Sequence, residues 1–340
     1  MTLRTAQLLC GATIFLSVLP ASGLAQRRPD RPLRRPFRQQ QAQSGQLMPE
    51  LLRRVVAAAS SLRLSGQRVV DQKVQGQLVR HEENVLRVGQ RTRIWFPPDS
   101  KFAGQIIVDN GTFRWRYNPH NQQVNQEPSQ RDDTLGRLIG PNNNLLAPRV
   151  ELADGGMVAG VHTTLAKIEN KQGLTVQALY IDPNTSAVLK RVGYDNTGQE
   201  VANYEFTSVN YSPTVGASDF EPPRTGKPIV TPEMVMRRQA NANGLPALIL
   251  RPGQGFQLNN SNVVMRANVK VLHEVYLGPG GSGRVSVFLL RAQIDPARLV
   301  ERAGRLMNAV STKYNDVTVV LVGPYTQEYL QRLAGTLTPE

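Results

Sequence analysis

Side chains that could do chemistry are few in this sequence, and they lie far apart. The four histidines, His81, His120, His162 and His273, lie far apart in the sequence, each in a different part of the chain. His81 is not followed by a second histidine four residues on, as a zinc protease requires. There is no Gly-x-Ser-x-Gly turn to hold a nucleophilic serine, and the single cysteine, Cys10, lies in a stretch expected to be cleaved off. The sequence therefore predicts no catalytic residue, no metal site and no cofactor, and indicates that the protein is not an enzyme.

One set of aromatic residues does stand out. Trp95 and Phe96 end one predicted strand, and Phe113, Trp115 and Tyr117 alternate along another. Residues two apart on a strand share a face, so Arg114 and Arg116 must point the other way. The pattern leaves two interpretations open. The aromatic face is either ordinary core or the lining of an apolar groove that binds a ligand.

The elements that would position these residues are mostly strands. Leu51, Leu52, Val55, Val56 and Ala59 form an apolar stripe that predicts a helix over residues 48–60. Alternating patterns then predict around nine strands with short antiparallel connections. They cover residues 66–75, 77–89, 91–96, 104–109, 112–117, 157–168, 173–182, 187–195 and 199–211. Residues 132–139 could form a short helix. Such a meander makes either a sandwich or a curved, partly closed barrel.

A proline-rich, charged stretch then separates a second region. Residues 221–233 lack periodicity and predict an exposed linker between a β domain over residues 47–220 and an α+β domain over residues 234–340. In the second domain we expect helices over residues 232–242, 295–308 and 324–335. We expect strands near residues 255–259, 268–277, 284–290 and 316–322, with the glycines from Gly278 to Gly283 as a hairpin loop rather than a phosphate cradle.

The start of the chain indicates export. Residues 1–25 combine Arg4, an apolar stretch from Leu8 to Leu19, and small residues after Pro20, which is typical of a cleaved signal peptide. An uncleaved membrane anchor is the alternative, although the stretch is short of the roughly 20 residues needed to span a bilayer. We expect a periplasmic or otherwise extracytoplasmic protein that is soluble after cleavage.

The formal net charge of +14 is partly local. Residues 26–46 are rich in arginine and proline and predict a disordered arm. Its six arginines could dock on an anionic envelope surface, or the arm could be a solvated tether without a partner. These arginines are Arg27, Arg28, Arg31, Arg34, Arg35 and Arg38. The arm has no interleaved aromatic residues for stacking on bases, and nucleic-acid binding is not expected.

Several runs resemble a known group of proteins. Residues 179–200 resemble a strand-turn-strand signature of the LolA-like superfamily, and residues 204–213 and 220–223 extend the match. Tyr276 and the residue runs 252–256, 285–289 and 316–323 are similar to the C-terminal part of the MucB/RseB sigma-E regulatory proteins, the two-domain members of that superfamily. The likeness spans roughly residues 48–337. The chain departs from the family in its hairpin glycines and in its basic arm.

The resemblance implies a mainly β protein: a half-open antiparallel β-barrel with capping helices, then a smaller α+β domain. It also implies a regulatory or sensor protein that binds a membrane anti-sigma factor and holds an acyl chain or lipid-type ligand in an apolar groove. The alternative is a periplasmic lipoprotein or lipid carrier of the LolA type, and an envelope structural protein without a ligand is a third possibility.

Overall fold

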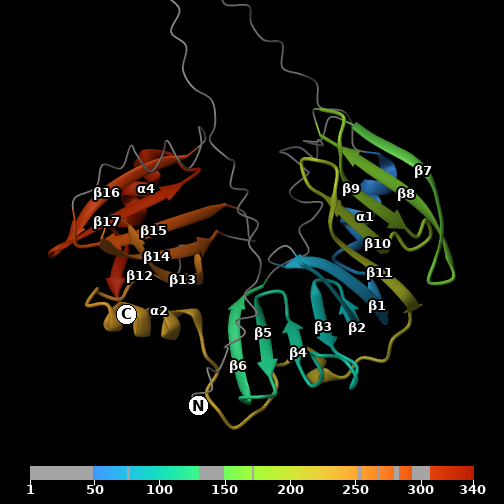
Figure 1. Ribbon diagram of the computed structural model, residues 1–340, viewed down its shortest axis with the longest axis horizontal. Helices are drawn as coiled ribbons and strands as arrows, with labels where there is room; N and C mark the ends of the chain where they lie inside the picture. The colour runs from blue at the N-terminus through green and yellow to red at the C-terminus, as the bar shows by residue number, and fades with distance from the viewer. Residues whose placement is uncertain are drawn as a thin grey trace, which may run out of the picture.

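The computed structural model describes residues 49–74, 77–129, 149–170, 172–251, 255–266, 268–278, 283–292 and 307–340. The predicted signal peptide, the basic arm and the predicted helix over residues 132–139 lie outside these ranges, as does nearly all of the predicted helix over residues 295–308. The described residues form two sheet systems, which we call the large-sheet region (residues 49–230) and the small-sheet region (residues 231–340) (Figure 1).

The large-sheet region holds eleven described strands in one antiparallel sheet, in the order β6-β5-β4-β3-β2-β1-β11-β10-β9-β8-β7. Strands β6 and β7 are its two edges, so the sheet is curved but not closed (Figure 1). The elements are α1 (Glu50–Ala58), β1 (Arg63–Val74), β2 (Gln77–Val88), β3 (Arg91–Trp95), β4 (Ile106–Asp109), β5 (Phe113–Asn118), β6 (Gln123–Pro128), β7 (Arg149–Val158), β8 (Val161–Glu169), β9 (Thr175–Ile181), β10 (Val188–Tyr194), β11 (Glu200–Asn210) and the short 3-10 helix η3 (Ala217–Phe220).

Short polar turns fix the register of these strands. Between β4 and β5, the side chain of Asn110 accepts hydrogen bonds from the backbone N–H groups of Thr112 and Phe113, both at 2.9 Å. Gly111 follows Asn110 with a φ of +89°, a conformation that side chains other than glycine rarely adopt. The Asn-Gly pair predicted from the sequence therefore makes this hairpin, and it places the alternating aromatic residues of β5 beside β4.

Helix α1 packs on the far end of the sheet. Its apolar stripe, Leu51, Leu52 and Val55, is buried against Ile168 of β8 and Leu179 of β9. Residues paired across neighbouring strands share a face of the sheet. The successive pairs that start at Leu179 are Arg191 on β10, Tyr204 on β11, Val70 on β1 and His81 on β2. Val85 lies four residues after His81 on β2 and therefore shares this face. The face that α1 covers is therefore the face of Val85, and Leu86 lies on the opposite one.

The small-sheet region contains a five-stranded antiparallel sheet, in the order β13-β14-β15-β17-β16, and a two-stranded sheet, β12-β18. Helices α2 and α4 cover one face of the five-stranded sheet, where Met236, Leu272, Leu321 and Leu330 are fully buried. The elements are α2 (Pro232–Ala242), β12 (Leu248–Leu250), β13 (Gln257–Arg266), β14 (Val269–Leu277), β15 (Arg284–Leu290), β16 (Asn308–Tyr314), β17 (Val317–Gly323), α4 (Gln327–Ala334) and β18 (Leu337–Pro339).

The segment that joins the two regions is tied to the edge of the large sheet. Val230 forms a parallel bridge with Asn125 of β6. The Val230 N–H donates to the carbonyl of Val124 at 2.9 Å, and the Gln126 N–H donates to the carbonyl of Val230 at 2.8 Å. Ile229 packs on the apolar cluster of β4 and β5. The end of the predicted linker thus acts as a short extra strand, and the N-cap Thr231 starts α2 directly after it.

The fold class predicted from the sequence is confirmed: a mainly β region with an open antiparallel sheet, followed by a smaller α+β region. The strand prediction was incomplete, since β6, β12, β16, β18 and all of β7 except its last two residues were not expected. Residues 157–168 were predicted as one strand, but a turn at Ala159 and Gly160 separates β7 from β8. Both turn residues have a positive φ. Alanine rarely adopts such a conformation, so the sequence contains no indication of a turn at Ala159.

Candidate functional site

Most of the predicted aromatic residues lie on one face of β3, β4 and β5. Leu86, Arg93, Val108 and Trp115 are paired across β2 to β5, and so form one row on that face. Trp95, Ile106 and Tyr117 form the next row. This is the face opposite to the one that α1 covers. Its apolar cluster also takes in Phe220 of η3.

A tight turn holds β3 in place beside β2. Gly89 has a φ of +59°, and a Cβ atom there would lie 2.4 Å from the carbonyl oxygen of Ser60, so only glycine fits without a shift. Arg87 also donates to the carbonyls of Gly89 and Ala59, at 2.9 and 3.3 Å. The turn is thereby fixed to the end of α1, and it sets the position of Arg93 and Trp95 on the next strand.

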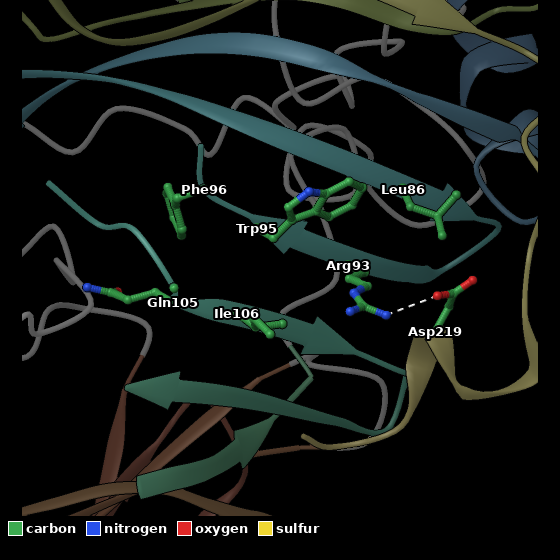
Figure 2. A pocket seen from close by; sticks show the side chains of 8 residues that line it. Leu86, Arg93, Trp95, Phe96, Gln105, Ile106 and Asp219 are labelled. Atoms are coloured by element: carbon green, nitrogen blue, oxygen red, sulfur yellow. Dashed lines mark hydrogen bonds and ion pairs between the residues drawn. The ribbon is translucent and has the colours of Figure 1, made fainter. Parts of the chain in front are cut away.

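Beside Trp95 lies a pocket of about 360 Å³. This volume falls within the usual range for small-molecule sites, about 300–1,000 Å³. Figure 2 shows Phe96 and Gln105 at one end, Trp95 and Ile106 in the middle, and an ion pair at the other end. The pocket is lined by Leu86, Arg93, Trp95, Phe96, Gly104, Gln105, Ile106 and Asp219. It is an apolar and aromatic pocket with one charged end.

The charged end joins β3 to η3. The Nη1 atom of Arg93 donates to Oδ1 of Asp219 at 2.9 Å, and the two side chains are 32% and 25% exposed. The other carboxylate oxygen of Asp219 accepts the backbone N–H of Gly216 at 2.7 Å. The guanidinium of Arg93 also lies 5.9 Å from the ring of Trp95. The ion pair is therefore partly solvated, and its carboxylate has a second donor.

The five residues predicted from the sequence divide into two groups. Trp95, which is 37% exposed, and Phe96 line the pocket. Trp115 is buried, and its indole N–H donates to Gln126 at 3.0 Å, while Phe113 and Tyr117 pack around it. These last three support the pocket from β5 and do not line it. A ligand-binding role for any of the five stays a prediction.

Sequence reasoning did not identify Arg93, Gln105, Ile106 or Asp219 as lining residues. Arg93 carried a usable signal, since it lies two residues before Trp95 and must share its face. Asp219 carried none, because it is 126 residues from Arg93 and reaches it only when η3 packs on β3.

A second cluster of buried charge lies on the opposite face, toward α1. Arg68 donates to Glu83 from Nε at 2.6 Å, and Nε2 of His81 lies 3.4 Å from the same carboxylate. Burial would raise the pKa of Glu83, but the positive charge of Arg68 and the contact with His81 lower it below its usual value. The rings of Phe96 and Phe102 pack against His81, with centroids 5.7 and 5.1 Å away. Phe96 thus contacts both the buried network and the pocket.

The small-sheet region buries a carboxyl group that pairs with no cation among the described residues. Glu274 is fully buried, and it accepts a hydrogen bond from the hydroxyl of Tyr276 at 2.8 Å. Burial raises the pKa of Glu274 to about 8. Its other oxygen, Oε1, has no hydrogen-bond partner among the described residues. The group lies in the core below α2 and borders no described pocket.

The lining of the pocket is mainly apolar and carries few polar groups. Within the described ranges, no group of three or more His, Cys, Asp or Glu side chains could hold a metal ion. The pocket offers apolar burial, an aromatic ring and one guanidinium, which are the features of a ligand site with few polar contacts.

Comparison with known proteins found similar solved structures. In the complex of Pseudomonas aeruginosa MucA and MucB, the matching chain is 19% identical, with a TM-score of 0.39; the match covers 86% of this chain and 98% of that one. A crystal structure of MucB is 18% identical, with a TM-score of 0.38, and covers 86% and 97%. No family model matches the chain, and no curated protein sequence does.

Shorter proteins match about half of the chain. A putative outer membrane lipoprotein-sorting protein domain from Vibrio parahaemolyticus is 12% identical, with a TM-score of 0.26, and covers 51% of this chain and 95% of its own. A LolA superfamily protein from Nitrosomonas europaea is 10% identical, with a TM-score of 0.25, and covers 49% and 96%.

No helix among the described residues is both long and apolar enough to cross a membrane.

Proposed function

We propose that the chain is an extracytoplasmic regulatory or sensor protein that binds an acyl chain or another lipid-type ligand in the pocket beside Trp95 and Phe96, and a membrane anti-sigma factor as its protein partner. One observation carries the ligand part of the proposal: the pocket is about 360 Å³, mostly apolar, and has a single charged end. The sequence resemblance to the MucB/RseB regulators supports the partner.

The pocket suits an acyl chain on energetic grounds. Burying one methylene group stabilises a complex by about 0.8 kcal/mol, so a chain of several carbons can bind without hydrogen bonds or ion pairs to the protein. Trp95 is 37% exposed and offers an apolar surface to such a chain. Leu86 and Ile106 add to the apolar lining of the pocket.

The partner proposal assigns different tasks to the two regions. We place the domain boundary within residues 221–233 and give the protein contact to the small-sheet region, which has its own core and sheet. MucB of Pseudomonas aeruginosa occurs in complex with MucA, and a pairing of that kind is what the experiments below look for. The signal peptide over residues 1–25, the periplasmic or other extracytoplasmic location and the docking of the basic arm on anionic envelope surface belong to the same proposal.

The ligand part is tested by displacing the dye N-phenyl-1-naphthylamine from the full chain with decanoate. Trp95→Ala should weaken binding about tenfold, because it removes the largest apolar contact of the pocket. Leu78→Ala is a matched control, since Leu78 is 68% exposed on β2 and does not line the pocket. Unchanged affinity in Trp95→Ala, or equal losses in both variants, would rule out this pocket as the ligand site.

The partner part is tested by binding to the extracytoplasmic segment of an anti-sigma factor from the same organism. The full chain should bind it, and a chain that lacks residues 232–340 should lose it while it still takes up the dye. Residues 228–230 are kept in this truncation because Val230 is hydrogen-bonded to β6. A truncated chain that binds the partner equally well would contradict the assignment to the small-sheet region.

The alternative, a lipid or lipoprotein carrier of the LolA type, makes a different prediction in the same assay. A carrier needs no anti-sigma factor, and the large-sheet region alone would take up and release its cargo. A full chain that binds decanoate but no anti-sigma segment would favour the carrier.

A further inference from the structure

We propose that the ligand of this pocket is an amphiphile with an anionic headgroup, and that Arg93 binds the headgroup by exchanging its contact with Asp219. The inference rests on the proposed ligand function and goes beyond it. It names the charge of the ligand, the residue that selects it and the segment that responds to it.

The local charge favours an anion. Arg91 and Arg93 alternate along β3, so both point to the pocket face, while Asp219 is the one carboxylate that lines the pocket. Arg91 is already engaged, since its guanidinium lies 4.7 Å from the ring of Phe220. Arg93 has five N–H donors, and Asp219 accepts from one of its nitrogens. The remaining donors are available to a carboxylate or phosphate oxygen, which a guanidinium binds in a forked geometry.

The shape of the pocket separates the two ends of such a ligand. Figure 2 shows the Arg93–Asp219 pair at one end and Phe96 at the other, with Trp95 and Ile106 between them. An acyl chain that lies along Trp95 toward Phe96 leaves its headgroup beside Arg93. A neutral headgroup has no charge with which to replace Asp219 beside Arg93, and a cationic headgroup is repelled by the guanidinium. The geometry therefore favours an anionic headgroup.

The exchange has a structural consequence, because Asp219 holds η3 on β3. When Arg93 turns to the headgroup, the Gly216 N–H is the one partner that the Asp219 carboxylate keeps among the described residues. The segment from η3 leads to Val230, which is bonded to the edge strand β6 just before α2 begins. Ligand binding therefore loosens the segment that connects the pocket to the small-sheet region, which is the part we assign to the protein partner.

The test uses isothermal titration of the full chain with decyl phosphate, with the neutral decyl maltoside and with inorganic phosphate. The wild type should bind decyl phosphate most tightly. Arg93→Gln should weaken decyl phosphate binding about tenfold and leave decyl maltoside unchanged. Asp219→Asn keeps an oxygen for the Gly216 N–H and removes the competing charge, so it should strengthen decyl phosphate binding. Arg93→Lys, which keeps the charge without the fork, should fall between wild type and Arg93→Gln.

Hydrogen exchange supplies a second readout. Decyl phosphate should speed exchange at the amides of residues 216–220 in the wild type, and decyl maltoside should not. If both detergents bind equally and Arg93→Gln changes neither, the headgroup inference fails while the acyl site stands. If neither binds, the proposed ligand function itself fails. If inorganic phosphate binds as tightly as decyl phosphate, the site takes a bare anion and the amphiphile is excluded.

Discussion

The two regions of the molecule bury a glutamate in opposite ways. In the large-sheet region, Glu83 is 5% exposed and stays charged, because Arg68 and His81 lower its pKa. In the small-sheet region, Glu274 is fully buried, the Tyr276 hydroxyl is its one donor among the described residues, and burial raises its pKa to about 8. Glu274 is therefore mainly protonated at neutral pH.

The difference shows how each interior is organised. The large sheet curves around a mixed interior, in which an ion pair is enclosed by aromatic rings such as Tyr204, 4.7 Å from the Arg68 guanidinium. The small sheet is covered by α2 and α4 over a mainly aliphatic core, and no cation among the described residues pairs with Glu274 there. A buried ion pair adds little net stability but is costly to break, whereas a lone buried carboxyl makes stability depend on pH.

The largest expected effect comes from breaking the ion pair. Arg68→Met keeps the apolar packing against the rings, but it removes the guanidinium whose positive charge compensates the Glu83 carboxylate. We expect a loss of about 3–5 kcal/mol in the free energy of unfolding. Urea denaturation followed by tryptophan fluorescence measures this region selectively, since both tryptophans, Trp95 and Trp115, lie in it.

The double variant Arg68→Met with Glu83→Gln is the control. Replacing both partners removes the uncompensated charge and should recover most of the lost stability. If Arg68→Met alone is as stable as the wild type, the description of a charge-dependent interior is wrong.

A smaller effect, of the opposite sign, is expected in the small-sheet region. The pKa of Glu274 is about 8 in the folded protein and 4.5 in its ordinary state. Between these pH values the unfolded chain releases a proton that the folded protein keeps, so stability falls as pH rises from about 4.5 to 8. Glu274→Gln removes this dependence and should stabilise the region by about 2–4 kcal/mol at pH 9, with little effect at pH 4.5.

Thermal unfolding of wild type and variant at both pH values, followed by circular dichroism, checks the slope. Glu328→Gln on α4 is the matched control, because the Glu328 side chain is 83% exposed and its removal should leave the slope unchanged. A Glu274→Gln variant that melts at the wild-type temperature at pH 9 would contradict the raised pKa.

The smallest effect sharpens the role of the histidine. His81 lies between two phenylalanine rings, its Nε2 contact with Glu83 is 3.4 Å, and its buried Nδ1 has no hydrogen-bond partner among the described residues. His81→Phe should fit the aromatic setting and change the free energy of unfolding by less than about 1 kcal/mol. The same urea assay measures it, and a loss as large as that of Arg68→Met would show that the network depends on the histidine as well.

Much of the fold followed from local chemistry. The hairpin at Asp109-Asn110-Gly111, the helix α1 with its apolar stripe and the switch to an α+β region all depend on residues adjacent in sequence. Edge strands were harder to predict. β6 (Gln123–Pro128) contains one apolar and four polar residues before its proline, so it lacks the alternation that marks a strand. It is held by pairing with β5 and by the bridge to Val230.

The candidate site was only partly predictable, because some of its residues follow a local pattern and others are brought together by packing. Trp95 and Phe96 were predicted because two adjacent aromatic residues at the end of a predicted strand are visible in the sequence, and both line the pocket. The sequence could not decide that Trp115 belongs to the core while Trp95 stays at the surface. That depends on where the segment with Phe220 packs.

The sequence by itself determined what the strands and helices are made of: the alternation that gives each strand two faces, the turns that join neighbours, and the lack of catalytic and metal-binding patterns. Only the tertiary structure decided which face is covered and by what. The pairing of Arg93 with Asp219, the bridge of Val230 to β6 and the burial of Glu274 without a cation each join residues through packing. Contacts between distant segments depend on how whole faces are buried against one another, and no local pattern encodes that.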